Sequence, residues 1–319
     1  MPDSALANAA VALLSDSPQV QTWPALQKRV AAYQLGNSGK HPCDYVRWAC
    51  TTAGGSAEAA VPGMAAIFAC MESIRLVDDL LDEDPDGLQH EVGTGTTANL
   101  AVALQALAHR AVHRSTLTTE AKEQVLHCLD TMMLDTAHGQ NEELGSTGTE
   151  EEYWRIVRLK TPPLFKAALY VGCRLGGTDL DTAQQVSTLG RWLGLLTQVS
   201  DDLHDVLQDK VTPDWLQPNK NLALLFMQVA EYPGKEEFLE RLAQVEHHND
   251  LAWLQQQLIS QGAISYGCNK IVELFQQGNQ QAWPESFALP AKQVFRTYLV
   301  QVEHLLTQSG IAVPEFLRT

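Results

Sequence analysis

The stretch ESIRLVDDLLDEDPDG, residues 72–87, is the most informative part of the sequence, because it holds seven acidic residues in sixteen positions. Read from Asp78 it is Asp-Asp-x-x-Asp, a carboxylate cluster that suits Mg²⁺ and a phosphorylated substrate. Read from Asp82 it is Asp-x-Asp-x-Asp-Gly, the opening of a calcium-binding EF-hand loop. That loop requires a bidentate glutamate at its twelfth position, where this chain has Gly93, and no second such loop follows. The residues therefore favour a magnesium site.

Two acidic clusters share one spacing, with aspartates at i, i+1 and i+4: Asp78, Asp79 and Asp82, and Asp201, Asp202 and Asp205. On a helix, residues i and i+4 lie one turn apart on the same face, so two carboxylates of each cluster point together. Each cluster follows a largely apolar run and should lie near the C-terminal end of a helix, where the helix dipole makes carboxylates costly. A solvated acidic surface is the alternative for either cluster alone. The repeated spacing favours a pair of Mg²⁺-binding clusters.

Apolar residues recur at helical spacing along nearly the whole chain, most clearly over residues 99–114, 121–139 and 183–207. Alternating, strand-like runs are almost absent. Turn residues predict breaks at 36–42, 84–87, 145–149, 160–163, 176–178, 211–220, 232–235 and 282–286. We therefore expect one all-α domain over residues 1–319, with about ten or more helices.

Composition limits the partners and the compartment. The formal net charge of −16 makes nucleic acid and anionic membranes poor partners. No stretch approaches the roughly 18 apolar residues of a membrane helix, so we expect no stable membrane insertion. An aspartate, and no basic region, precedes the apolar run at 5–14, which argues against a signal peptide and predicts a packed helix. Six scattered cysteines without a C-x-x-C pair indicate reduced thiols in a cytoplasmic protein.

The residues before the second cluster form one helical face. Gly190 and Gly194 are four apart, and Gln198 follows four further on, three before Asp201. A glycine costs about 1 kcal/mol relative to alanine inside a helix, so two of them indicate a close approach. The approaching group is either another helix or a ligand, and both alternatives remain open at this point.

These motifs resemble those of the trans-isoprenyl diphosphate synthase superfamily. Further segments resemble its motifs in the same order: SGKHP (38–42), HGQNEEL (138–144), RLKTPPLFKAALYVGCRLGG (158–177), PNKNLALLF (218–226) and QGAISYGCNKIVELF (261–275). The resemblance covers nearly the whole chain. It implies a single-domain isoprenoid synthase fold, a helical bundle around a central cavity, a prenyl diphosphate substrate, three Mg²⁺ ions and a homodimer.

The resemblance also implies roles for individual residues. Ligands for two Mg²⁺ ions would be Asp78, Asp79 and Asp82, and for the third Asp201, with Asp205 assisting and Asp202 in the same motif. Residues that would contact or support the diphosphate are Lys160, Lys220, Gln198, Lys210 and Arg75. Arg75 alternatively pairs with Asp79 one helical turn away, which we favour. Residues that would line the cavity are Ser73, Ile74, Thr161, Phe165 and Thr197.

The chain departs from the family at the site for isopentenyl diphosphate. Lys40 is present, but Cys43 replaces an arginine, Met71 replaces a histidine or glutamine, and no arginine pair follows Asp82. Each charge-assisted hydrogen bond lost there weakens binding by about 1.5–3 kcal/mol. We therefore predict a class I terpene synthase that removes diphosphate from an allylic prenyl diphosphate. Water, deprotonation or cyclisation would then quench the cation, giving an alcohol or a hydrocarbon.

Two other functions remain open. One is a prenyltransferase, or polyprenyl diphosphate synthase, that condenses the allylic diphosphate with isopentenyl diphosphate or another acceptor. The other is a catalytically silent partner subunit of a heteromeric synthase.

In the family, large aromatic residues four or five positions before the first aspartate block the floor of the cavity. Ile74 and Ser73 stand there, which predicts a deep cavity for chains of C15–C20 or longer.

Overall fold

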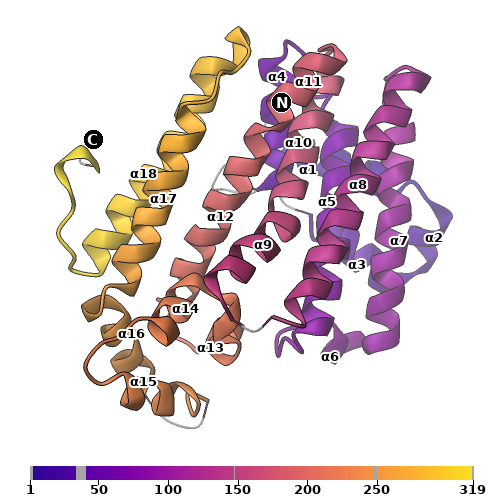
Figure 1. Cartoon of the computed structure of the whole chain (residues 1–319). Coiled ribbons are helices and arrows are strands. Elements are labelled where there is room, and N and C mark those ends of the chain that lie inside the picture. Colours follow the sequence, from indigo (N-terminus) through magenta and orange to yellow (C-terminus); the bar gives the residue numbers. More distant parts are fainter. Residues whose placement is uncertain (1–2, 34–40, 147, 247–249, 318–319) are drawn as a thin grey trace. The chain divides into compact units, whose positions relative to one another are not determined.

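The computed structural model describes residues 3–33, 41–146, 148–246 and 250–317. Every regular element within these ranges is a helix, so the all-α prediction is confirmed (Figure 1). Contacts within the chain define two compact units. Unit 1 comprises residues 1–138, 162–191 and 283–290, and unit 2 comprises residues 139–161, 192–282 and 291–319. Because the segments alternate along the chain, neither unit is a contiguous half of the sequence.

Unit 1 is organised around α5 (Val61–Leu81), which carries the first aspartate cluster at its end. Its neighbours are α1 (Asp3–Ser15), α4 (Pro42–Thr52), α7 (Thr94–His113) and α10 (Pro162–Leu175). The shorter helices of this unit are α2 (Pro18–Thr22), α3 (Pro24–Ala31), α6 (Gln89–Val92) and α11 (Leu180–Ser187). A proline stands in the first turn of α2, α3, α4 and α5, where its missing N–H has no helical partner to lose. The predicted N-terminal helix is α1, which buries Leu6, Ala10 and Leu14.

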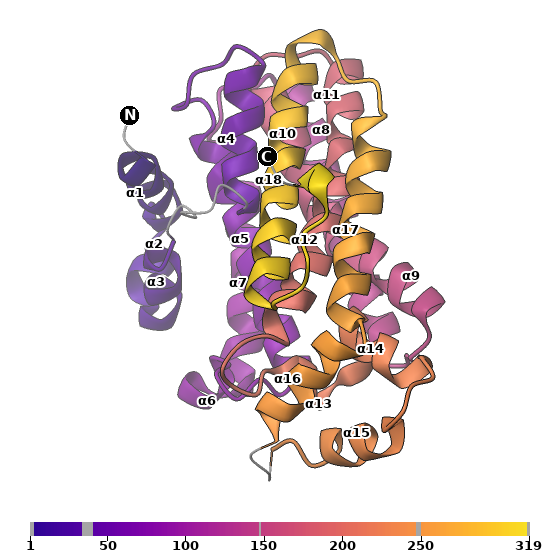
Figure 2. The ribbon, with the colours of Figure 1, turned by 90° about the vertical axis from the view of Figure 1, so that its left-hand side faces the viewer.

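Unit 2 is organised around α14 (Leu222–Val229), which contacts α9 (Glu150–Lys160), α15 (Lys235–Leu242), α16 (Leu251–Ser260) and α17 (Ala263–Asn279). Single-turn elements are α13 (Pro213–Leu216), η1 (Pro218–Lys220) and η2 (Glu315–Leu317). Three helices contribute residues to both units: α8 (Thr119–Glu143), α12 (Leu189–Asp205) and α18 (Glu285–Gln308). Within unit 2, α17 runs beside the 291–308 part of α18 (Figure 2), where the Phe275 and Phe295 rings lie 6.5 Å apart.

Most predicted breaks lie at helix ends, as at 84–87, 145–149, 160–163, 176–178, 232–235 and 282–286. The break at 36–42 falls largely outside the described residues. The apolar run at 183–207 is not one helix, because the chain divides at Thr188 between α11 and α12. There the Ser187 and Thr188 hydroxyls donate to the carbonyls of Gln184 and Gln185, both at 2.7 Å. Such local bonds compete with helix continuation.

Two predictions from composition can be compared with the structure. Over the described ranges, we find no helix that is both long and apolar enough to cross a membrane. All six cysteines of the chain lie in the described ranges and are free thiols.

Candidate active site

The first aspartate cluster lies at the C-terminal end of α5 in unit 1. Asp78 and Asp79 belong to its last turn and Asp82 is its C-cap, and all three are half-buried. Burial raises the pKa of Asp79, Arg75 lowers it, and the negative charges of Asp84 and Asp78 raise it. The Arg75 Nε atom lies 3.8 Å from Asp79 Oδ2, across one helical turn. Arg75 therefore forms the intrahelical pair that we favoured.

The turn after α5 closes the helix around this cluster. Glu83 adopts a left-handed conformation with φ of 51°, and the Asp84 N–H donates to the Asp79 carbonyl at 3.0 Å. This closure resembles a Schellman motif, in which the left-handed residue is usually glycine. The Gln89 side-chain amide donates to the carbonyls of Asp79 and Asp84, at 3.0 and 3.1 Å. A side-chain amide therefore caps the end of α5, in a segment after Asp82 that has no arginine pair.

The second aspartate cluster lies in the last turn of α12 in unit 2, and its three members have different surroundings. Asp201 is exposed and Asp205 is half-buried, whereas Asp202 is only 2% exposed. Burial raises the pKa of Asp205, while the charge of His204 and a hydrogen bond from Gln208 lower it. Burial also raises the pKa of Asp202, to about 7. The spacing alone did not distinguish Asp202 from the other two aspartates.

Asp202 is held by donors of the protein itself. It accepts hydrogen bonds from the Tyr153 hydroxyl (2.6 Å), the Gln198 amide (2.9 Å) and the Leu222 backbone N–H (2.8 Å). Since both of its oxygens are bonded to these groups, its surroundings are those of a structural anchor. Asp201 is exposed and Asp205 is half-buried, so the expectation of a metal ligand, which we held for the whole cluster, stays a prediction for these two residues.

Two of the predicted lysines meet in unit 2. The Nζ atoms of Lys160 and Lys220 lie 2.6 and 3.3 Å from the same Oε2 atom of Glu143. All three residues line a small cavity of about 30 Å³, together with Gln198. The Thr161 hydroxyl donates to Gln198 Oε1 at 2.6 Å, which links the end of α9 to α12. Residues predicted from three separate motifs therefore come together within one unit.

The remaining cavity residues have different neighbours. Ser73 is fully buried and its hydroxyl accepts a hydrogen bond from Gln105 on α7 at 3.1 Å, so it packs between helices of unit 1. Phe165 is buried against Tyr45, with ring centroids 5.5 Å apart. In unit 2, the hydroxyl oxygens of Thr197 and Tyr298 lie 2.8 Å apart. Ile74 is half-buried on α5.

Of the residues expected at the second diphosphate site, the structure describes Cys43 and Met71. Lys40 lies outside the described residues. Cys43 is fully buried in the first turn of α4, where its thiol donates to the Met64 carbonyl at 3.5 Å, and Met71 is half-buried on α5. Lys210, which was predicted as a further contact of the allylic diphosphate, is exposed after α12.

Several residues with central contacts were not among the predicted site residues. Arg29 on α3 forms an ion pair with Glu72 on α5, and the two side chains are 16% and 6% exposed. Glu143 stands in HGQNEEL (138–144), which resembles a family motif but gives no sign of its contact with two lysines, and Tyr153 stands in a stretch that the sequence marks only as acidic. Their importance depends on partners far away in the chain, which no local pattern encodes. Asn221, directly after Lys220, could have been found as a helix N-cap, since it accepts from the N–H groups at the start of α14.

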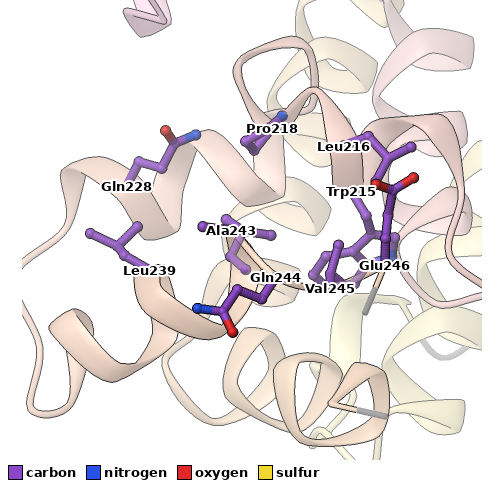
Figure 3. Close-up of a pocket in the computed structure, with 10 residues that line it drawn as sticks. Trp215, Leu216, Pro218, Gln228, Leu239, Ala243, Gln244, Val245 and Glu246 are labelled. Atoms are coloured by element: carbon purple, nitrogen blue, oxygen red, sulfur yellow. The ribbon is translucent and has the colours of Figure 1, made fainter. Parts of the chain in front are cut away.

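A wider cavity of about 340 Å³ lies among α13, α14 and α15 (Figure 3). Its walls include Trp215, Leu239 and Val245, and Glu246 is the one charged residue among the described residues that line it. A cavity whose single charge is negative repels a diphosphate. The lysine cavity is therefore the better candidate for phosphate binding.

Within each unit taken by itself, the carboxylates outside the Asp202 network have the oxygen-donor chemistry that Mg²⁺ prefers. Asp78, Asp82, Asp201 and Asp205 offer hard oxygen ligands at helix ends, and Mg²⁺ commonly binds through a few carboxylates together with substrate phosphates. The raised pKa values of Asp79 and Asp205 show that burial disfavours their charged forms. A nearby cation would offset this cost.

Comparisons with known proteins identify the family. The family model described as Polyprenyl synthetase matches residues 25–256. Geranylgeranyl pyrophosphate synthase 6, mitochondrial, of Arabidopsis thaliana is 29% identical over 177 residues, which cover 49% of this chain and 53% of that protein. The match thus spans about half the length of this curated relative.

Solved structures show the same fold. The geranylgeranyl pyrophosphate synthetase from Pyrococcus horikoshii matches with a TM-score of 0.74 and 22% identity, over 92% of this chain and 94% of that one. A decaprenyl diphosphate synthase from Rhodobacter capsulatus matches with a TM-score of 0.74 and 20% identity, over 95% and 96% of the two chains. The predicted isoprenoid synthase fold is therefore confirmed.

The terpene synthase prediction is wrong. It is contradicted by these comparisons, because the similar proteins are named as synthases of prenyl diphosphates. The prediction assumed that a cation absent from a motif position is absent from the site. Arg29, which no motif indicated, reaches α5 from another helix of unit 1. The family match and the fold agree, and the chain belongs to the polyprenyl synthetase family.

Proposed function

We propose that this protein is a prenyltransferase that condenses an allylic prenyl diphosphate with isopentenyl diphosphate or another acceptor. In the reaction with isopentenyl diphosphate, the allylic C–O bond breaks, a C–C bond forms, and diphosphate and a proton are released. The proposal is supported by the family and by the names of the relatives. The observation that carries it is the meeting of Lys160, Lys220 and Gln198 at one cavity.

The two lysines would hold the diphosphate of the allylic substrate. Ammonium groups form charge-assisted hydrogen bonds with phosphate oxygens, each contributing about 1.5–3 kcal/mol. Such local cations are required in a chain whose formal net charge is −16. Gln198 would orient the same group, because its side chain is itself fixed by Thr161 and Asp202.

Magnesium would bind at the two aspartate clusters. We assign Asp78, Asp79 and Asp82 from α5, and Asp201 and Asp205 from α12, to three ions as in the family. Bound Mg²⁺ stabilises the negative charge of a departing diphosphate. The clusters themselves supply the carboxylate oxygens and their fixed positions at the helix ends.

Basic residues outside the usual motif would assist the acceptor's diphosphate. Arg29 and Arg75 both lower the pKa of Asp79, so their positive charges act on the first cluster. Cys43, by contrast, is fully buried. We assign the role of the missing arginines, which is to bind the acceptor's diphosphate, to Arg29 and Arg75.

We further propose that both units form one functional domain over residues 1–319, which acts as a homodimer. The units alternate along the sequence, and the family match at 25–256 runs through segments of both. The homodimer is proposed on the family resemblance.

The function can be tested by product analysis. The protein is incubated with Mg²⁺ and geranyl, farnesyl or geranylgeranyl diphosphate, with and without isopentenyl diphosphate, and the products are identified by mass spectrometry. Longer prenyl diphosphates that require both substrates support the proposal. Alcohols or hydrocarbons formed equally well without isopentenyl diphosphate contradict it, and so does the absence of any product.

A further inference from the structure

Asp202 lies at the centre of a buried hydrogen-bond network in unit 2. Its Oδ1 accepts from the Gln198 amide at 2.9 Å, and its Oδ2 accepts from the Tyr153 hydroxyl at 2.6 Å and the Leu222 N–H at 2.8 Å. Its backbone carbonyl accepts from the Asn221 amide at 2.8 Å. These partners come from α9, α12 and the start of α14, so one residue joins three helices.

One branch of the hydrogen-bond network ends at Thr161, directly after Lys160. The Gln198 side chain donates to Asp202 through its amide nitrogen and accepts from the Thr161 hydroxyl through its oxygen, at 2.6 Å. Thr161 is the C-cap of α9 and directly follows Lys160. Asp202 therefore fixes the amide orientation of Gln198, and Gln198 in turn holds the segment that presents Lys160.

The other branch ends beside the second lysine. Asn221 and Leu222 directly follow Lys220 and bond to the carbonyl and the carboxylate of Asp202. Asn221 is fully buried, and its amide also donates to Asp214 at 2.6 Å. The backbone on the C-terminal side of Lys220 is thus tied to α12.

The lysines beside the two branches meet at one oxygen atom of Glu143. The Nζ atoms of Lys160 and Lys220 lie 2.6 and 3.3 Å from a single Glu143 oxygen, at a cavity that Tyr153 and Gln198 also line. The spacing between the two ammonium groups is therefore set by two segments, of which the one after Lys220 bonds to Asp202 directly and the one after Lys160 is linked to it through Gln198.

We propose that Asp202 is a positioning residue that fixes the two lysines for diphosphate binding and does not coordinate a metal. This inference rests on the proposed function, because it assigns diphosphate to the lysines. A carboxylate that is 2% exposed and accepts three hydrogen bonds has no free face for a metal ion. The metal ligands of the second cluster are then Asp201 and Asp205, one helical turn apart.

Three variants separate positioning from metal binding. Asp202→Asn keeps the shape but replaces one accepting oxygen by an NH₂ group, so either Gln198 or the pair Tyr153 and Leu222 loses its acceptor. Tyr153→Phe removes one donor and leaves Asp202 in place. Asp201→Asn removes a proposed metal ligand and serves as the comparison. Circular dichroism and thermal unfolding check that each variant folds. If Asp202→Asn does not fold, Tyr153→Phe alone tests the proposal.

Two quantities are measured. The first is the affinity for inorganic diphosphate, measured by calorimetry at saturating Mg²⁺. The second is the Mg²⁺ midpoint, which is the Mg²⁺ concentration that gives half-maximal binding at fixed diphosphate. We expect Asp202→Asn to weaken diphosphate binding about tenfold and Tyr153→Phe about threefold, with an unchanged Mg²⁺ midpoint. Asp201→Asn should raise the Mg²⁺ midpoint instead. The proposal is overturned if Asp202→Asn shifts the Mg²⁺ midpoint as Asp201→Asn does, or if Tyr153→Phe binds diphosphate like the unmodified protein. Turnover is not needed, so a protein that binds diphosphate without forming product contradicts the proposed function alone.

Discussion

At the residue scale, the lysine cavity combines like charges with one shared partner. Lys160 and Lys220 are 18% and 19% exposed and meet the same oxygen of Glu143, which is 12% exposed. Ammonium groups held this close repel each other, and the carboxylate offsets part of that repulsion. A diphosphate would offer both lysines further acceptors. Its affinity should therefore depend on both ammonium groups.

The first prediction concerns Lys160→Met. Loss of one charge-assisted hydrogen bond should weaken the binding of inorganic diphosphate at saturating Mg²⁺ by about tenfold or more. Isothermal titration calorimetry measures the change. Lys292→Met, at an exposed position of α18, is the matched control and should bind like the unmodified protein. Equal affinities of the two variants would contradict the role of Lys160.

The second prediction concerns pH and Asp202. Burial, and then the charge of Asp214, raise the pKa of Asp202 from 3.8 to about 7, against the hydrogen bonds from Tyr153, Leu222 and Gln198. The folded protein thus binds this proton more tightly than the unfolded chain does. The contribution of Asp202 to stability is complete below about pH 4 and falls as the pH rises to about 7.

Asp202→Asn should flatten this part of the stability profile, because an amide does not titrate. The free energy of unfolding is measured by urea titration between pH 4 and pH 7. Parallel slopes for the variant and the unmodified protein would show that other groups cause the decline.

The sequence predicts several residues of the candidate site, but it does not predict their hydrogen-bond and ion-pair partners. Lys160, Lys220 and Gln198 stand in motifs, and the structure brings them to one cavity. Glu143 and Arg29 acquire their meaning from residues that are distant in the chain. The spacing also cannot show that Asp202 points inward, because its three donors come from three helices.

At the scale of elements, helix ends position the aspartate clusters. The apolar run of α5 ends at the first cluster, and the chain turns there through Glu83 in a left-handed conformation, with φ of 51°. That conformation costs a residue with a Cβ about 1–2 kcal/mol. The strain lies directly after Asp82, at the end of the proposed metal-binding segment.

The third prediction is that Glu83→Gly stabilises the protein by about 1 kcal/mol, because glycine adopts this conformation without strain. Thermal unfolding measures the effect. Glu123→Gly, at an exposed position inside α8, should lower stability by about 1 kcal/mol. A fall in stability for both variants would show that the turn carries no strain.

The contacts of Gly190 decide between the two explanations, helix packing or ligand approach, for this one of the two glycines of α12. A Cβ at Gly190 would lie 2.3 Å from the Lys166 nitrogen and 2.5 Å from the Phe165 carbonyl carbon. Both atoms belong to the backbone of α10, so Gly190 serves helix packing. The nearby break at Thr188 was missed because apolar spacing continues across it.

The fourth prediction follows from this contact. Gly190→Ala should destabilise the protein by about 1–3 kcal/mol, since backbone atoms cannot move aside. Gly95→Ala, where the added methyl meets no atom within 4 Å, should be neutral or stabilising by up to about 1 kcal/mol. Denaturant titration of both variants tests the comparison. Equal stabilities would remove the packing explanation.

At the scale of the whole molecule, charge and family membership support the proposed function. A chain with a formal net charge of −16 binds diphosphate only through local cations, and the structure concentrates two of them at one cavity. The all-α fold and most helix ends follow from apolar periodicity and turn residues. The terpene synthase prediction relied on missing motif residues, although cations can also come from any helix that packs nearby.

The most direct test of the proposed prenyl transfer uses labelled isopentenyl diphosphate. We predict that the protein incorporates the label into a longer prenyl diphosphate in the presence of Mg²⁺ and farnesyl diphosphate. Asp78→Ala and Asp201→Ala should each lower incorporation by at least about a hundredfold. Label that stays in isopentenyl diphosphate, while farnesyl diphosphate is converted to an alcohol or a hydrocarbon, would contradict the account.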